Sequence, residues 1–422
     1  MSSRDLIELA LQKPDSPQFH KALLASVPEA GLKAGTASLS GRGQALFAVE
    51  SSGTPRLFID EAPSSAMNEI SGSHLWFAVV PLKTGRGHSF YYMTDGKKFG
   101  GNANVPSFGS DSYLKPGVPQ GKLSEKAVFT SKIYDGMQSD YWVYAPAQYD
   151  PNTPAALMVW DDGGQFIHRD STSIRLLEVI DNLTYEKRLP VIVWVFTMPG
   201  VATMAEGTPF YKAVQKAAKA NTQAARTNAL RGVEYETLSD QYARFLGDEL
   251  LPYVQSKYNI RKDAYSHAIA GLSSGALGAF TAAWEHPDQF SRVLVWVTPF
   301  TSGQWQPSVR DGGNIYPFKI RKEPKKNLRI WLQDGCDDLE NANGSVPLQN
   351  IEVANSLKLQ GYDFHLSFGV GGHSPMQGSA EFPESLAWLW RGYDPAKTQE
   401  TYTMDDTEKL QPVFRVHIFN RE

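Results

Sequence analysis

The sequence predicts an α/β fold, a mostly parallel sheet with helices on both faces, preceded by a small N-terminal β-sandwich. After residue 125, short apolar strands alternate with helical segments, which is typical of a parallel sheet. Residues 33–118 instead contain short alternating runs separated by Gly, Pro, Ser and Asn, which is typical of a sandwich. A length of 422 residues is sufficient for two such domains.

The N-terminal part is predicted to comprise a helical arm at 1–30 and the sandwich at 31–122. Residues 4–26 read as one or two short helices with a break at Pro14, and the sandwich includes strands at 45–49, 75–79 and 89–93. Residues 97–121 are rich in turn formers and have no apolar period, so we interpret them as an ordered linker.

The α/β domain is predicted to span 123–422. Its helices are expected at 171–182, 237–257 and 273–286. Its strands are expected at 141–144, 156–160, 191–196, 265–269, 293–296, 328–332 and 363–366.

The composition excludes several classes of function. Charged residues make up 20% of the chain and the formal net charge is −4, so no basic field is available to bind nucleic acid or an anionic membrane. The single Cys336 excludes an intrachain disulfide and CxxC chemistry. No apolar run reaches the length of a membrane helix, and the N-terminus lacks a signal-peptide pattern. We expect a cytoplasmic protein, although a secreted or periplasmic protein whose signal has been removed fits the same sequence.

A nucleophile motif occurs where a predicted strand meets a predicted helix. The segment Gly271-Leu-Ser-Ser-Gly275 follows an apolar strand and precedes an alanine-rich helix, which is the context of a nucleophile elbow. Glycines two positions to each side allow the sharp turn that lifts Ser273 above the sheet. Ser273 is therefore the predicted nucleophile of an α/β-hydrolase, and the amide of Ser274 is a predicted oxyanion donor.

The base and the acid should follow in the order acid, then histidine. His373 lies in a Gly-rich loop directly after the last predicted strand, whereas His365 and His286 have structural settings. The loop after strand 328–332 carries four carboxylates. Asp338 is the preferred acid, and Asp337 and Asp334 remain alternatives. The spacing does not match an EF-hand, so we expect neither a metal nor a cofactor.

A second oxyanion donor is expected in the loop after strand 156–160. The segment Asp161-Asp-Gly-Gly-Gln-Phe166 has glycines that allow its backbone to approach a substrate closely. Gly164 or Gln165 is the predicted donor.

At these motifs the chain resembles the putative-esterase family of α/β-hydrolases, which includes enterochelin, feruloyl and esterase D-type enzymes. The resemblance covers about residues 125–395 and rests on DDGGQF, GLSSGALGAFTAAWEHPDQFSRVL, GCDD and GGHSPMQ. It implies the roles of Ser273, Asp338 and His373, and it matches Asp162 to the family's Asp-Gly turn. A sandwich before the hydrolase domain is similar to enterochelin esterases, but no basic cluster for an anionic iron complex is evident beyond 321–326.

Other residues are candidates for substrate contacts. The aromatic residues Trp160, Phe300 and Trp305 lie in or beside predicted loop ends, and with Asp162 they are the predicted substrate-binding residues. Residues 198–231 form either a lid or a surface helix. Arg231 and Glu234 are expected to form an ion pair, either structural or beside the site.

The predicted function is hydrolysis of a small-molecule or carbohydrate-linked ester through an acyl-enzyme intermediate. Acyl transfer to a sugar acceptor could use the same residues, and a non-catalytic carbohydrate-binding protein could keep the same fold. No nucleic acid or membrane partner is expected, and a homo-oligomer is compatible with the sequence.

Overall fold

The computed structural model describes residues 1–200, 207–217, 230–304 and 311–411. The chain begins with three short helices, α1 (Ser3–Gln12), α2 (Pro17–Ser26) and α3 (Glu29–Ala34). Ser2 and Ser16 cap the first two helices by accepting backbone N–H bonds. Of the one or two helices expected at 4–26, two are present, with the break near Pro14, whereas α3 was not predicted.

Two four-stranded antiparallel sheets follow these helices, in the orders β1-β2-β6-β5 and β4-β3-β7-β8. Phe47, Phe90 and Tyr92 are buried between the sheets. The other face of the first sheet packs on apolar residues of the helices, such as Leu6 and Phe19. The strands are β1 (Ala37–Gly41), β2 (Gln44–Glu50), β3 (Arg56–Ile59), β4 (Ala62–Ala66), β5 (Asn68–Ile70), β6 (Leu75–Pro81), β7 (Arg86–Thr94) and β8 (Lys97–Ser107).

Strand β8 corrects the interpretation of residues 97–121 as a linker. Its eleven residues pair antiparallel with β7 through two register shifts. Gly100 and Gly101 have positive φ values of 61° and 107°, and these conformations accommodate the irregular pairing. The strand lacks an apolar period because only its last residues, from Val105 onward, are buried.

The second part of the chain contains a nine-stranded sheet in the order β10-β11-β13-β12-β14-β15-β16-β19, with β9 also pairing with β11. Six of these strands pair in parallel, namely β12, β13, β14, β15, β16 and β19, and β9, β10 and β11 form an antiparallel edge. The strands are β9 (Lys122–Leu123), β10 (Ala127–Thr130), β11 (Gln138–Ala145), β12 (Ala156–Trp160), β13 (Ile192–Thr197), β14 (His267–Leu272), β15 (Arg292–Trp296), β16 (Arg329–Asp337) and β19 (Asp363–Gly372). A separate small hairpin consists of β17 (Glu340–Asn341) and β18 (Gly344–Ser345).

Helices cover both faces of this sheet, as predicted. Apolar residues of α4 and α12 pack on one face, and those of α7 to α11 pack on the other. The helices are α4 (Leu176–Tyr185), α5 (Pro209–Ala217), α7 (Gln241–Arg244), α8 (Leu251–Gln255), α9 (Ser274–Glu285), α10 (Tyr316–Lys322), α11 (Val346–Leu359), α12 (Met376–Leu389) and α13 (Asp406–Leu410). The helix predicted at 237–257 is α7 and α8 joined by a π-type turn at Phe245–Leu250. The helix predicted at 171–182 begins later, at Leu176.

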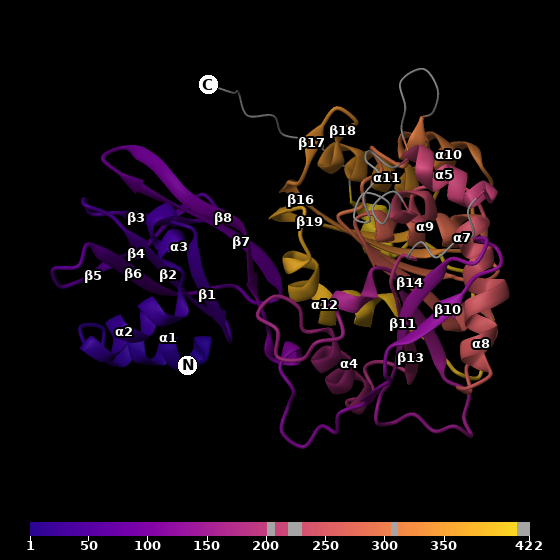
Figure 1. Cartoon of the computed structure of the whole chain (residues 1–422), viewed down its shortest axis with the longest axis horizontal. Coiled ribbons are helices and arrows are strands. Elements are labelled where there is room, and N and C mark those ends of the chain that lie inside the picture. The colour runs from indigo at the N-terminus through magenta and orange to yellow at the C-terminus, as the bar shows by residue number, and fades with distance from the viewer. Residues whose placement is uncertain (201–206, 218–229, 305–310, 412–422) are drawn as a thin grey trace.

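The N-terminal sheets lie beside the α/β domain, with β7 and β8 facing α12 and β19 (Figure 1). The part of the chain that the structure describes contains no helix long and apolar enough to cross a membrane.

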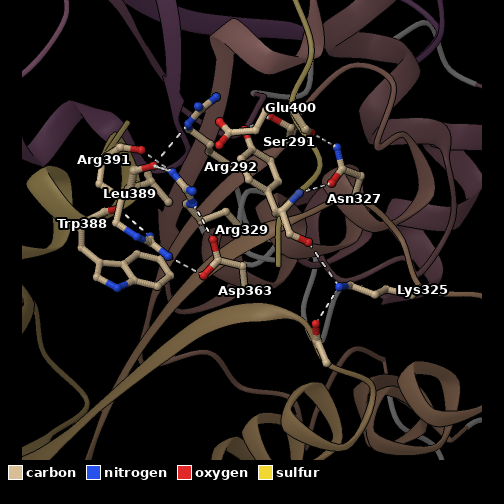
Figure 2. Close-up of polar contacts among 12 residues, drawn as sticks. Ser291, Arg292, Lys325, Asn327, Arg329, Asp363, Trp388, Leu389, Arg391 and Glu400 are labelled. Atoms are coloured by element: carbon tan, nitrogen blue, oxygen red, sulfur yellow. Dashed lines mark hydrogen bonds and ion pairs between the residues drawn. The ribbon is translucent and has the colours of Figure 1, made fainter. Parts of the chain in front are cut away.

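A buried polar network connects the chain after α12 to the amino ends of the parallel strands, which is the end of the sheet opposite the nucleophile (Figure 2). Asp363 is 1% exposed and accepts hydrogen bonds from Arg329 at 2.7 Å and Arg391 at 2.5 Å. Arg292 is fully buried between the rings of Tyr265 and Trp390. One carboxylate therefore neutralises two guanidinium groups, that of Arg329 at the start of β16 and that of Arg391 just after α12.

We predict that Asp363→Asn destabilises the protein by about 3 kcal/mol, because it leaves two largely buried cations without their counter-charge. Urea unfolding followed by circular dichroism measures the change. Asp406→Asn is the matched control, because Asp406 pairs with Lys409 on the surface and its side chain is 91% exposed. A loss for Asp363→Asn as small as that of the control would contradict the assigned role of the network.

Candidate active site

Ser273 lies on a sharp turn between β14, in the middle of the sheet, and α9. Its backbone has φ 57° and ψ −129°, a conformation that non-glycine residues rarely adopt. A Cβ at Gly271 would lie 2.5 Å from the backbone carbonyl carbon of Gly275, so the turn requires glycine there. The predicted nucleophile elbow is therefore present, with the serine hydroxyl at the carboxyl end of the parallel strands.

Three of the predicted site residues form one continuous hydrogen-bonded chain. The Ser273 hydroxyl donates to Nε2 of His373 at 2.7 Å, and Nδ1 of His373 donates to Oδ1 of Asp338 at 2.7 Å. The His373 side chain is 21% exposed, whereas that of Asp338 is fully buried. This geometry places a hydroxyl, an imidazole and a carboxylate in the order that nucleophilic catalysis requires.

The structure distinguishes between the carboxylates of the acid loop. Asp337 is exposed, and Asp338 contacts the histidine. Burial alone would raise the pKa of Asp338, but hydrogen bonds from His373, Asp334 and the Leu339 amide hold that pKa below its ordinary value. Asp338 is therefore ionised at neutral pH and can stabilise an imidazolium.

Asp334, the other alternative acid of this loop, lies behind Asp338. It is fully buried, and burial together with the adjacent Asp338 carboxylate raises its pKa to about 9. At neutral pH Asp334 is therefore a neutral acid that donates a hydrogen bond to Asp338 and accepts one from the Gly335 amide at 2.8 Å.

We predict that Asp334→Asn makes the protein more stable relative to the wild type as pH rises. The raised pKa of Asp334 means that its contribution to stability is complete below about pH 4 and is lost progressively toward about pH 9. Asparagine can make the same hydrogen bonds and does not titrate. Urea unfolding of both proteins at about pH 5 and about pH 8 measures the difference, and a difference that does not change with pH would contradict the neutral state of Asp334.

One predicted oxyanion donor, Ser274, belongs to the elbow, and the other two, Gly164 and Gln165, belong to the turn after β12. Ser274 is the first residue of α9, where backbone N–H groups lack partners within the helix, and its hydroxyl donates to Glu236 at 2.5 Å. Gly164 lies in the turn Gly163–Gln165, and its N–H points at the sulfur of Met198 at 3.2 Å. A thioether is a weak acceptor, so an oxyanion could replace it. Gln165 is exposed in the same turn.

The predicted pairing of Arg231 with Glu234 is wrong. Arg231 instead forms an ion pair with Asp162, through its Nε at 3.1 Å and through a second contact from its terminal nitrogen. Glu234 accepts the Gly200 amide at 2.9 Å, and burial raises its pKa to about 8. Asp162 is 7% exposed, borders Gly275 of the elbow and is paired with Arg231, so its side chain is not free to contact a substrate.

Two of the three aromatic candidates for substrate binding lie in the core. Trp160 is fully buried against Phe166 and Trp296, and Phe300 is fully buried against Phe280 and Tyr316. Neither ring can contact a substrate without unpacking the core. Trp305 and much of the segment 198–231 lie outside the described residues.

A cavity of about 760 Å³ lies between Glu236 and α10, and none of its lining residues belongs to the elbow. Glu236, which accepts the Ser274 hydroxyl, forms part of its wall, and Leu238, Ile315 and Phe318 provide apolar surface. Sequence reasoning missed these residues because none belongs to a motif. Among residues 1–200, 207–217, 230–304 and 311–411, no three His, Cys, Asp or Glu side chains gather in a way that could hold a metal ion.

A parallel sheet with a strained serine turn at its centre defines an α/β-hydrolase. Residues 136–389, more than half of the chain, match the family described as "Putative esterase", and the chain belongs to this family. The predicted resemblance is thereby confirmed, and the protein is an ester hydrolase.

Two individual proteins are also similar to parts of the chain. The uncharacterized protein YjcH of Bacillus subtilis is 19% identical over 251 residues, which are 58% of this chain and 88% of YjcH. An endo-1,4-beta-xylanase/feruloyl esterase of Xylanibacter ruminicola is 28% identical over 106 residues, 25% of this chain and 12% of that protein.

Solved structures share the fold along most of the chain. The enterobactin esterase of Shigella flexneri in the presence of 2,3-di-hydroxy-N-benzoyl-serine has a TM-score of 0.53 at 16% identity, covering 89% of this chain and 99% of its own. The ferric enterobactin esterase of Salmonella typhimurium has a TM-score of 0.51 at 16% identity, covering 85% and 97%. Both coverages exceed the share of the chain that the α/β domain makes up, so the matches extend into the N-terminal part.

Proposed function

We propose that the chain hydrolyses carboxylic esters by two-step acyl transfer with Ser273 as nucleophile, His373 as general base and acid, and Asp338 as the carboxylate that orients the imidazole. The observation that carries this proposal is the pair of 2.7 Å hydrogen bonds that join the three side chains at a strained elbow. Serine is a weak nucleophile by itself, and a hydrogen-bonded imidazole activates it.

In the first step, Oγ of Ser273 adds to the ester carbonyl carbon while its proton passes to Nε2 of His373. The carbonyl oxygen becomes an oxyanion, which accepts hydrogen bonds from the amides of Ser274 and Gly164. The carbon to alkoxy-oxygen bond then breaks, and the alcohol leaves with the proton from His373. Water repeats the sequence on the acyl-enzyme, which releases the acid and restores the serine.

The substrate class that we propose is an ester of an aromatic, hydroxylated acid. The cavity beside Glu236 has apolar surface from Leu238, Ile315 and Phe318, which suits an aromatic ring. The named similar proteins, enterobactin and feruloyl esterases, point to the same class.

Pre-steady-state hydrolysis of p-nitrophenyl acetate tests the two-step mechanism. We expect a burst of about one p-nitrophenol per chain before the steady state, because p-nitrophenolate is a good leaving group and acylation is therefore faster than hydrolysis of the acyl-enzyme. A parallel panel of methyl ferulate, an acetylated sugar and a catecholate serine ester tests the substrate class by kcat/KM. The absence of hydrolysis of every ester would overturn the proposal, and a preference for the acetylated sugar would overturn its aromatic part.

A further inference from the structure

One side chain of the N-terminal domain contacts the loop that carries His373. Asn104, in β8, accepts two hydrogen bonds through its Oδ1 atom: one from the backbone N–H of Gly372 at 2.9 Å and one from the hydroxyl of Ser374 at 2.8 Å. These donors are the residues immediately before and after His373. One amide oxygen therefore binds the backbone before the imidazole and the side chain of the residue after it.

The loop needs such a fastening because of its composition. His373 follows Gly371 and Gly372, and glycines give a chain wide conformational freedom. Within the α/β domain, this segment is held by Gln377, which accepts the Gly371 amide at 3.3 Å, and by the pairing of Gly372 with Asp337 at the end of the sheet. The His373 ring is held by its 2.7 Å bond to Asp338. The residues beside it are held by the two bonds to Asn104, which are shorter than the 3.3 Å contact with Gln377.

Asn104 is itself firmly held. Its backbone N–H donates to the side chain of Asn102 at 2.8 Å, and the next residue, Val105, is 2% exposed and pairs with His88 of β7. Strands β7 and β8 in turn pack on α12 and β19. A Cβ at Gly372 would lie 3.4 Å from the side-chain Nδ2 of Asn104, which shows how closely the two domains meet here.

We infer that Asn104 is a positioning residue for His373, through which the N-terminal domain completes the active site of the α/β domain. The inference rests on the proposed function of His373 as the general base. Its consequence is that the N-terminal sheets contribute to catalysis through His373, by fixing the distance between the imidazole and Ser273. A displacement of about 1 Å at a reacting group can reduce the rate about a hundredfold.

Replacement of Asn104 by residues of similar size measures the effect of its hydrogen bonds while the packing stays nearly the same. Asn104→Leu removes the acceptor, and we expect kcat for p-nitrophenyl acetate to fall by about 10- to 100-fold with a much smaller change in KM. Asn104→Asp keeps an acceptor oxygen and should restore most of kcat. A purely structural role for Asn104 would change the melting temperature without this split between kcat and KM or this rescue.

Asn68→Leu is the matched control, because Asn68 is exposed on β5 in the other sheet of the same domain. We expect this variant to keep the wild-type kcat. Wild-type kcat in Asn104→Leu, or an equal loss in Asn104→Asp and Asn104→Leu, would overturn the positioning role. Ser273→Ala separates failure of the proposed function from failure of this inference. If Ser273→Ala hydrolyses the ester normally, both the proposed function and the inference fail. If Ser273→Ala is inactive and Asn104→Leu is fully active, only the inference fails.

Discussion

Ser273→Ala is expected to reduce kcat for ester hydrolysis by at least about 10⁴-fold, because it removes the atom that forms the acyl-enzyme. Folding should be unaffected, since alanine keeps the Cβ that serine already places at φ 57° and therefore adds no strain. Initial rates with p-nitrophenyl acetate and thermal unfolding measure the two effects.

The control for this variant is Ser65→Ala, at an exposed position in β4. It should match the wild type in both rate and stability. Residual activity of Ser273→Ala within about tenfold of the wild type would mean that another group is the nucleophile.

Asp338→Asn is expected to lower kcat by about 10⁴-fold, a loss of the size that follows when an amide replaces the carboxylate beside a catalytic histidine. An asparagine can donate a hydrogen bond to Nδ1, which would place the histidine proton on Nε2, where the serine hydroxyl needs an acceptor. The loss should appear mainly in kcat, because Asp338 is fully buried and does not contact the substrate.

Asp337→Asn provides a control one residue away. Asp337 is exposed, and its side chain has no part in the hydrogen-bonded chain of Ser273, His373 and Asp338, so we expect its kcat to stay within about twofold of the wild type. If Asp337→Asn lost activity and Asp338→Asn did not, the assignment of the acid would be reversed.

Local sequence patterns predicted the features that depend on neighbours in the chain. The elbow needs glycines at fixed offsets from Ser273 between a strand and a helix, and both requirements can be read from consecutive residues. The order of acid and histidine follows from the succession of strands. The sequence distinguished Asp338 from Asp337 only weakly. Adjacent residues of a strand point to opposite faces, and the pairing of β16 with β19 shifts register between Gly335 and Asp337, so the direction of each side chain could not be read from its position in the sequence.

Features that depend on distant partners were not predictable in the same way. Trp160 ends a strand, and the sequence does not reveal which face of the sheet its ring lies on. Arg231 finds its counter-charge 69 residues away at Asp162 and not at the nearby Glu234. Strand β8 was missed because its backbone order comes from pairing with β7, so the role of Asn104 beside His373 could not be seen before the fold.

The most direct test of the central claim is the site of covalent modification by a fluorophosphonate, identified by mass spectrometry of the digested protein. We predict one adduct per chain, on the peptide that contains Ser273, formed rapidly in the wild type and far more slowly in His373→Ala, because the imidazole activates the hydroxyl. An adduct on another residue, or equal labelling rates with and without His373, would contradict the account.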